Sequence, residues 1–147
     1  MSLKKDILAI MLSGVATMIF MSMFFGAFPT NAYSWASFDT GYLQADPGEQ
    51  QTQYRIAFDF EYDSLKVYSY TSPAITCQGS YPYHCEEHGE DYTFIDGPYG
   101  IRHLHVYGFA QFHYVFLWMQ HYENIIVDGD ALPGGNTQLS FAVWRTY

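Results

Sequence analysis

The sequence predicts a mainly β protein, in which an N-terminal transmembrane helix is followed by a small antiparallel β-sandwich or barrel-like domain. Residues 7–28 contain no charged side chain, which is typical of a membrane span. The chain after residue 29 alternates short apolar-polar runs with Gly and Pro turn signals. This second part shows no strong amphipathic helical pattern, so its fold class is antiparallel β.

The first element is the predicted membrane helix. At a rise of about 1.5 Å per residue, the 22 positions from 7 to 28 cross the roughly 30 Å hydrocarbon layer of a bilayer. A cleavable signal peptide is the alternative, but its apolar region is usually only about 7–15 residues long. Lys4 and Lys5 place residues 1–6 in the cytoplasm by the positive-inside rule, so the C-terminal domain is expected on the non-cytoplasmic side of the membrane.

Small residues recur every four positions along this helix and define two faces that another helix could approach closely. We expect lateral packing through these positions, although they could equally face lipid: Ala9, Ser13, Thr17, Ser22 and Gly26. Residues 29–50 have no sustained period and are predicted to be a linker with at most one short strand. Within it, Tyr33 and Trp35 lie where an interfacial aromatic belt would be.

The β-domain is predicted over residues 51–147. Its clearest strand is 54–62, in which Tyr54, Ile56 and Phe58 share one face and charged residues occupy the other. The apolar run 111–122 fits either a doubly buried strand or a helix, and its Phe, Tyr, Val and Trp favour the strand. Further strands are expected at 65–70, 92–95, 102–107 and 138–146, and residues 124–127 are expected to extend the element at 111–122.

Residues 72–100 are rich in Gly and Pro and are predicted to be mostly loop. The two cysteines of the chain, Cys77 and Cys85, lie in this stretch. On the far side of a membrane they would meet an oxidising compartment, and the residues between them can turn back. A disulfide is therefore the expected state, and a long loop closed by a disulfide is typical of an exposed binding element.

Charge and composition narrow the class of function. The chain has 15 acidic and 6 basic residues, which argues against nucleic-acid binding because a phosphate backbone needs a basic surface. No nucleophile elbow or phosphate-binding loop is present, so no enzymatic activity is predicted. Aromatic residues make up 20% of the chain, which favours either a surface for binding other proteins or a Tyr-rich sheet without a partner.

All six histidines lie between residues 84 and 121. Imidazole, thiolate and carboxylate groups are the usual ligands of zinc and copper, so the candidate ligands of a metal site are His84, Cys85, His88, His103 and His105. The alternative is a disulfide at Cys85 and solvated histidines elsewhere. The spacing of Cys85 and His88 resembles part of the blue-copper pattern, although the Met that follows in that family is missing, since the next one is Met119.

These observations predict a single-pass membrane protein that serves as an accessory or assembly subunit of a larger membrane complex. Its partners would be other membrane proteins, bound through the helix and the aromatic-rich domain, and no cofactor is required. An apolar N-terminal helix before a β-rich head also resembles the plan of archaeal pilins, which implies a filament-forming subunit as one alternative. The other alternative is a copper- or zinc-binding extracytoplasmic domain.

Overall fold

The computed structural model describes residues 32–45 and 51–146. The predicted membrane helix lies outside these residues, and so do its proposed packing positions, Ala9, Ser13, Thr17, Ser22 and Gly26. None of the helices within the described ranges has the length and apolar character needed to span a bilayer. The membrane anchor therefore stays a prediction from the sequence.

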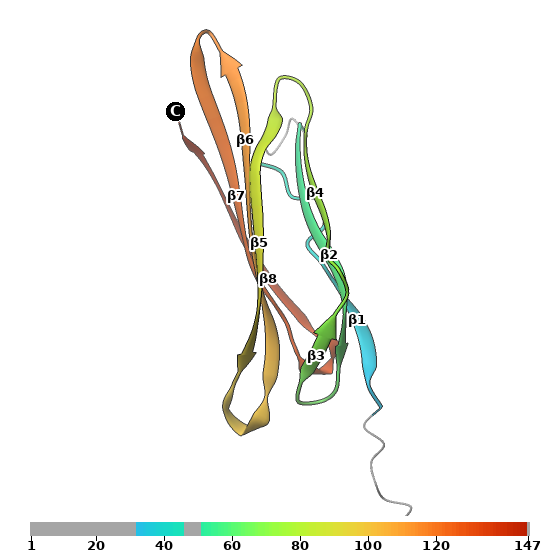
Figure 1. The fold of residues 1–147 in the computed structure, drawn as a ribbon. Coiled ribbons are helices and arrows are strands. Elements are labelled where there is room, and N and C mark those ends of the chain that lie inside the picture. Colours follow the sequence, from blue (N-terminus) through green and yellow to red (C-terminus); the bar gives the residue numbers. More distant parts are fainter. Residues whose placement is uncertain (1–31, 46–50, 147) are drawn as a thin grey trace, which may run out of the picture. The chain divides into compact units, whose positions relative to one another are not determined.

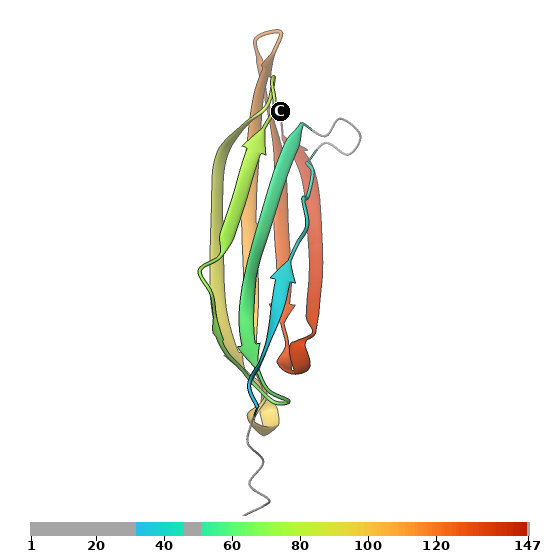
Figure 2. The ribbon, with the colours of Figure 1, turned by 90° about the vertical axis from the view of Figure 1, so that its right-hand side faces the viewer.

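Two antiparallel sheets form the domain, as Figures 1 and 2 show. The first sheet contains β1 (Ser34–Asp39), β2 (Thr52–Tyr62), β3 (Val67–Tyr70) and β4 (Ala74–Gly79), with β2 paired to each of the other three. The second sheet has the order β5 (His84–Asp96), β6 (Arg102–Phe116), β7 (Met119–Ala131) and β8 (Thr137–Thr146). The predicted mainly β, sandwich-like class is confirmed.

The core lies between the sheets and follows the alternation of β2. Tyr54, Ile56 and Phe60 are fully buried, whereas Asp59 on the other face is exposed. The second sheet contributes buried residues from its inner face: Leu104, Val106, Ala110, Phe112, Ile125, Val127 and Ala131. Because every strand of the first sheet pairs with β2, the strand with the strongest sequence signal organises that sheet.

Residues 34–39 form the edge strand β1, which is the one short strand allowed for in the predicted linker. Its Phe38 is buried and stacks on Phe58 with ring centroids 5.0 Å apart. The stretch 72–100 is mostly strand rather than loop, since it contains β4 and all of β5. Because most residues of β5 are polar, the strand has no apolar alternation by which it could be predicted. Its backbone hydrogen bonds are made by pairing with β6 along its length.

The apolar run 111–122 is confirmed as β structure, but it contains the end of one strand, β6, and the start of the next, β7. Residues Leu117 and Trp118 form a tight turn between β6 and β7, whose last pair is Phe116 with Met119. The β6–β7 hairpin projects at one end of the sandwich, at the top of Figure 1. The first residue of β1, Ser34, lies at the opposite end, where it pairs with Tyr62 of β2.

Candidate functional site

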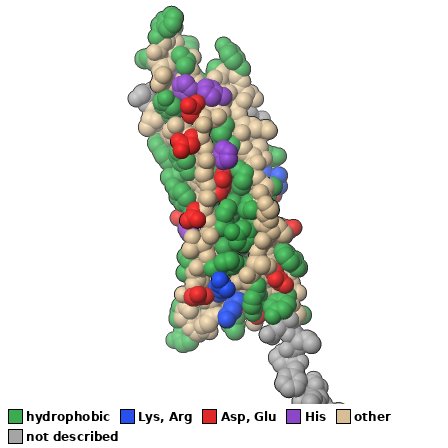
Figure 3. Space-filling model, viewed as in Figure 1, with side chains coloured by type: hydrophobic (Ala, Val, Ile, Leu, Met, Phe, Trp, Pro, Cys, Tyr) green, Lys and Arg blue, Asp and Glu red, His purple; other side chains and the backbone are tan. Residues whose placement is uncertain are grey.

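The tip of the β6–β7 hairpin exposes five consecutive large apolar side chains, which we call the apolar tip: Val115, Phe116, Leu117, Trp118 and Met119. Trp118 at the apex is 98% exposed. Residues 97–122 contain no Asp or Glu, although the chain as a whole is acidic. Figure 3 shows green apolar side chains at this end of the domain, with purple histidines just below them. Contiguous exposed apolar surfaces are typical of sites at which proteins bind other molecules.

The turn at the apex has unfavourable backbone geometry for its residues. Leu117 and Trp118 adopt φ angles of 49° and 67°, in the left-handed region that Gly and Asn occupy most easily. A two-residue hairpin turn with positive φ at both positions favours Asn-Gly or Gly-Gly. Two bulky apolar residues therefore stand where small residues would be more stable.

Stacked rings form the base of the apolar tip. Tyr114 of β6 stacks on His121 of β7 with centroids 4.8 Å apart, and its other neighbour is Tyr83, at 4.4 Å. His113 stacks on Tyr122 at 4.8 Å. These contacts fix the two strands below the apex, so that the exposed side chains stand on a rigid support.

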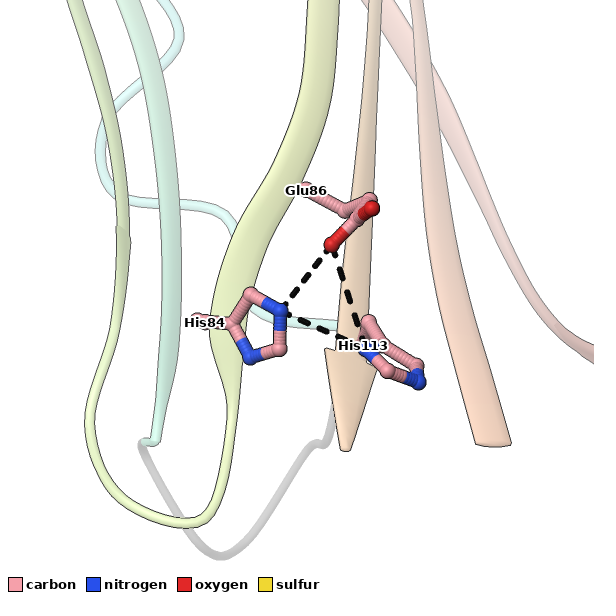
Figure 4. Close-up of side chains that lie close together, drawn as sticks. All are labelled: His84, Glu86 and His113. Carbon is pink, nitrogen blue, oxygen red and sulfur yellow. Dashed lines mark hydrogen bonds and ion pairs between the residues drawn. The ribbon is translucent and has the colours of Figure 1, made fainter. Parts of the chain in front are cut away.

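Two histidines and a carboxylate converge on the outer face of the second sheet, and we call them the His-Glu-His cluster: His84, Glu86 and His113. Nε2 of His84 lies 2.9 Å from Oε2 of Glu86 and 3.3 Å from Nδ1 of His113. The third edge of the triangle, from Nδ1 of His113 to Oε2 of Glu86, is 3.8 Å. Figure 4 shows the two imidazoles, one from each strand, facing the carboxylate oxygen.

The local backbone explains how these side chains meet. His84 of β5 is the direct cross-strand partner of His113 of β6, so their side chains are neighbours on one face. The ladder then shifts register between Cys85 and Glu87, which leaves Glu86 as the extra residue of a β-bulge. Bulges re-aim side chains, and this one directs the Glu86 carboxylate towards the histidine pair.

The predicted disulfide is confirmed. Cys77 of β4 and Cys85 of β5 are bonded, with their Cα atoms 5.8 Å apart, and the bond links the two sheets. Cys85 is consequently no metal ligand, because a disulfide sulfur carries no thiolate. This corrects the candidate ligand set at that position.

The remaining predicted ligands lie apart from His84. His88 contacts Glu90, with its Nδ1 3.1 Å from Oε1. His103 and His105 share a different carboxylate, since both approach Oδ1 of Asp130, at 3.5 and 3.2 Å. His105 pairs with Thr93, nine residues beyond His84 along β5, so at about 3.4 Å per residue the two groups are roughly 30 Å apart. The structure therefore does not bring the five candidates together.

Sequence reasoning missed His113 as a partner of His84. The clustering of six histidines indicated the region, but the pairing of residue 84 with residue 113 depends on the register of β5 against β6. The predicted interfacial residues Tyr33 and Trp35 are both exposed, and the Tyr33 ring contacts that of Tyr68 edge to face. Their role at a membrane boundary stays a prediction.

Comparison of the chain with protein-family models, with curated proteins and with solved structures finds no match.

Proposed function

We propose that this protein is a non-enzymatic, membrane-anchored accessory or assembly subunit that docks on a partner protein through its apolar tip. The observation that carries the proposal is the exposed run Val115–Met119, held on a turn that its residues do not favour. Exposed Trp and other aromatic side chains are the residues that contribute most to protein-protein interfaces. The sequence adds the anchor at 7–28 and its small-residue faces, which would bring the subunit to a membrane complex.

The position of the tip supports a protein partner. Ser34, the first residue of β1, and the apolar tip lie at opposite ends of the sandwich. A partner bound at the tip would therefore not contact the end of the domain at which β1 begins. The rings beneath the tip belong to two Tyr-His stacks, and aromatic rings are enriched in protein-protein interfaces. The same end also presents Tyr81, which is 94% exposed, in the β4–β5 connection.

Site-specific cross-linking of the full chain in its native membranes tests this function. A photoreactive phenylalanine analogue replaces Trp118 in one variant and Tyr99 in the control. Tyr99 is a matched position because it is 94% exposed and lies on the turn Pro98–Gly100 at the other end of the hairpin pair β5–β6. We expect a protein adduct of defined mass from residue 118 and none from residue 99.

The mass of the adduct separates the alternatives. An adduct with a different protein supports the accessory subunit, and its sequence can be identified by mass spectrometry. An adduct of two copies of this chain would instead support a pilin-like assembly, and filaments in negative-stain images would then be expected. Equal labelling from both positions, or adducts with lipid only, would overturn docking through the apolar tip.

A further inference from the structure

We propose that the His-Glu-His cluster is a binding site for a divalent transition-metal ion of the zinc class, with Nε2 of His84, Oε2 of Glu86 and Nδ1 of His113 as the ligands. The site lies on the outer face of the second sheet, and none of its three ligands belongs to the apolar tip. Two imidazole nitrogens and one carboxylate oxygen form a ligand set that zinc uses in proteins, with a fourth position left to water or another ligand.

The geometry of the three donor atoms fits this ion. Ligands about 2.05 Å from a tetrahedral zinc ion are about 3.3 Å from one another. The donor atoms of the cluster are separated by 2.9, 3.3 and 3.8 Å, which are distances distributed around that value. The cluster therefore already resembles one face of a coordination tetrahedron, and small side-chain rotations would complete it.

Hydrogen bonds alone satisfy these three groups less well than a bound metal ion would. Nε2 of His84 faces both the Glu86 carboxylate and Nδ1 of His113, yet it carries at most one proton. One proton cannot be donated well to two acceptors in different directions. A bound cation would interact with a lone pair on each of the three atoms at once.

The supporting structure holds the ligands in place. His84 and His113 are fixed by the β5–β6 ladder, and the disulfide at Cys85 tethers the residue between His84 and Glu86 to β4. The His113 ring is stacked on Tyr122, and its side chain is only 14% exposed. Ligands that are already ordered lose little conformational freedom when a metal binds, so affinity is gained.

Other histidines provide internal controls. Within the residues that the structure describes, no other group of three His, Cys, Asp or Glu has donor atoms all within 4.8 Å of one another. His88 contacts one carboxylate, Glu90, and is exposed to a similar extent as His84, with 46% against 57% of its side chain accessible. A substitution at His88 thus matches one at His84 in strand and residue type, but leaves the proposed ligands intact.

Titration of the purified, chelator-treated full chain with Zn²⁺, followed by calorimetry, tests the site. We expect one ion per chain, and dissociation constants at least about 100-fold higher for H84Q and E86Q, because loss of a direct ligand exceeds the 10–100-fold effect of losing an outer partner. H88Q should bind as the unaltered protein does. Co²⁺ in place of Zn²⁺ should give the visible absorption of a tetrahedral complex, which H113Q should abolish.

Several outcomes would overturn the assignment. They are the absence of Zn²⁺ binding by the unaltered chain, unchanged binding by H84Q, or an equal loss in H84Q and H88Q. His84 and Glu86 are exposed, so their variants are expected to fold, and far-ultraviolet circular dichroism verifies this. Cross-linking at residue 118 in the metal-free protein measures docking separately, so failure of one proposal is distinguishable from failure of the other.

Discussion

Arg145 of β8 donates through Nε to Oε1 of Glu123 in β7 at 2.6 Å, and the glutamate side chain is completely buried while that of the arginine is 52% exposed. The residues are direct cross-strand partners. The phenol of Tyr83 also donates to Oε1, at 3.3 Å. The buried carboxyl group is thus reached by an arginine from the solvent side.

We expect R145M to lower the free energy of unfolding by about 3–5 kcal/mol, because it leaves the buried carboxylate of Glu123 without its cationic partner. The double variant E123Q/R145M should recover part of this loss, since the side chain at position 123 then carries no charge. Urea unfolding monitored by Trp fluorescence measures both. A loss below about 0.5 kcal/mol in R145M would contradict the importance of the pair.

Replacement of Leu117 and Trp118 by Asn and Gly is expected to stabilise the protein by about 1 kcal/mol. Both positions have positive φ, and Asn-Gly is the preferred sequence for a two-residue turn of this kind. W118A is the control, because it keeps a residue with a Cβ and should change stability by no more than about 0.5 kcal/mol. Thermal unfolding provides the measurement, and destabilisation by Asn-Gly would show that the apolar side chains serve stability rather than binding.

Gly129 of β7 marks a close approach between the two sheets. An added Cβ there would lie 2.8 Å from the carbonyl oxygen of Gln138 and 2.9 Å from Cζ of Phe38. We expect G129A to cost about 1–3 kcal/mol, because the backbone of β8 and the buried Phe38 ring would have to move. Gly89 of β5 is the matched control, since nothing lies within 4 Å of its added Cβ. Equal denaturation midpoints for G129A and G89A would refute the close packing.

We expect the free energy of unfolding to fall at alkaline pH because of two tyrosines, Tyr54 and Tyr92. Burial raises the pKa of both phenols, and for Tyr54 the hydrogen bond that it donates to Glu90 raises the pKa further. A folded-state pKa above the unfolded value of about 10 means that the stabilisation is complete below pH 10 and is lost as the pH rises beyond it.

The variants Y54F and Y92F separate ionisation from hydrogen bonding. Both should flatten the fall in unfolding free energy above pH 10, because each removes one phenol. At pH 7, Y54F should cost about 1 kcal/mol through loss of the bond to Glu90. Urea titrations at pH 7 and pH 10.5 provide the comparison, and an unchanged alkaline slope in both variants would rule out these phenols as its source.

The strands that could be predicted from the sequence are those with one buried face. Tyr54, Ile56 and Phe58 alternate with polar residues because the first sheet has the core on one side, and β2 was expected within two residues of its observed bounds. The long strand β5 was missed beyond 92–95, because its residues are mostly exposed and its stability comes from pairing with β6. Alternation of apolar and polar residues arises because one face of a strand is buried, so a strand with both faces exposed shows little alternation.

One candidate site could be predicted from the sequence and another could not. The disulfide was predictable because only two cysteines exist and the residues between them can turn back. The histidine cluster was not, because His84 and His113 are 29 positions apart and meet only through the register of a ladder that also contains a bulge at Glu86. A shift of one residue would move His113 to the opposite face of the sheet.

The sequence by itself determined the antiparallel β class, the order of the strongest strands, the disulfide and the acidic, aromatic character of the chain, because these depend on local residue types and their alternation. Only the tertiary structure decided which surfaces these residues form. It turned the apolar run 111–122, which looks like a buried segment, into a hairpin whose apex is solvent-exposed. The physical reason is that side-chain exposure depends on where the two sheets end. The hairpin extends beyond the end of the opposing sheet, where none of the strands in residues 32–45 and 51–146 covers it.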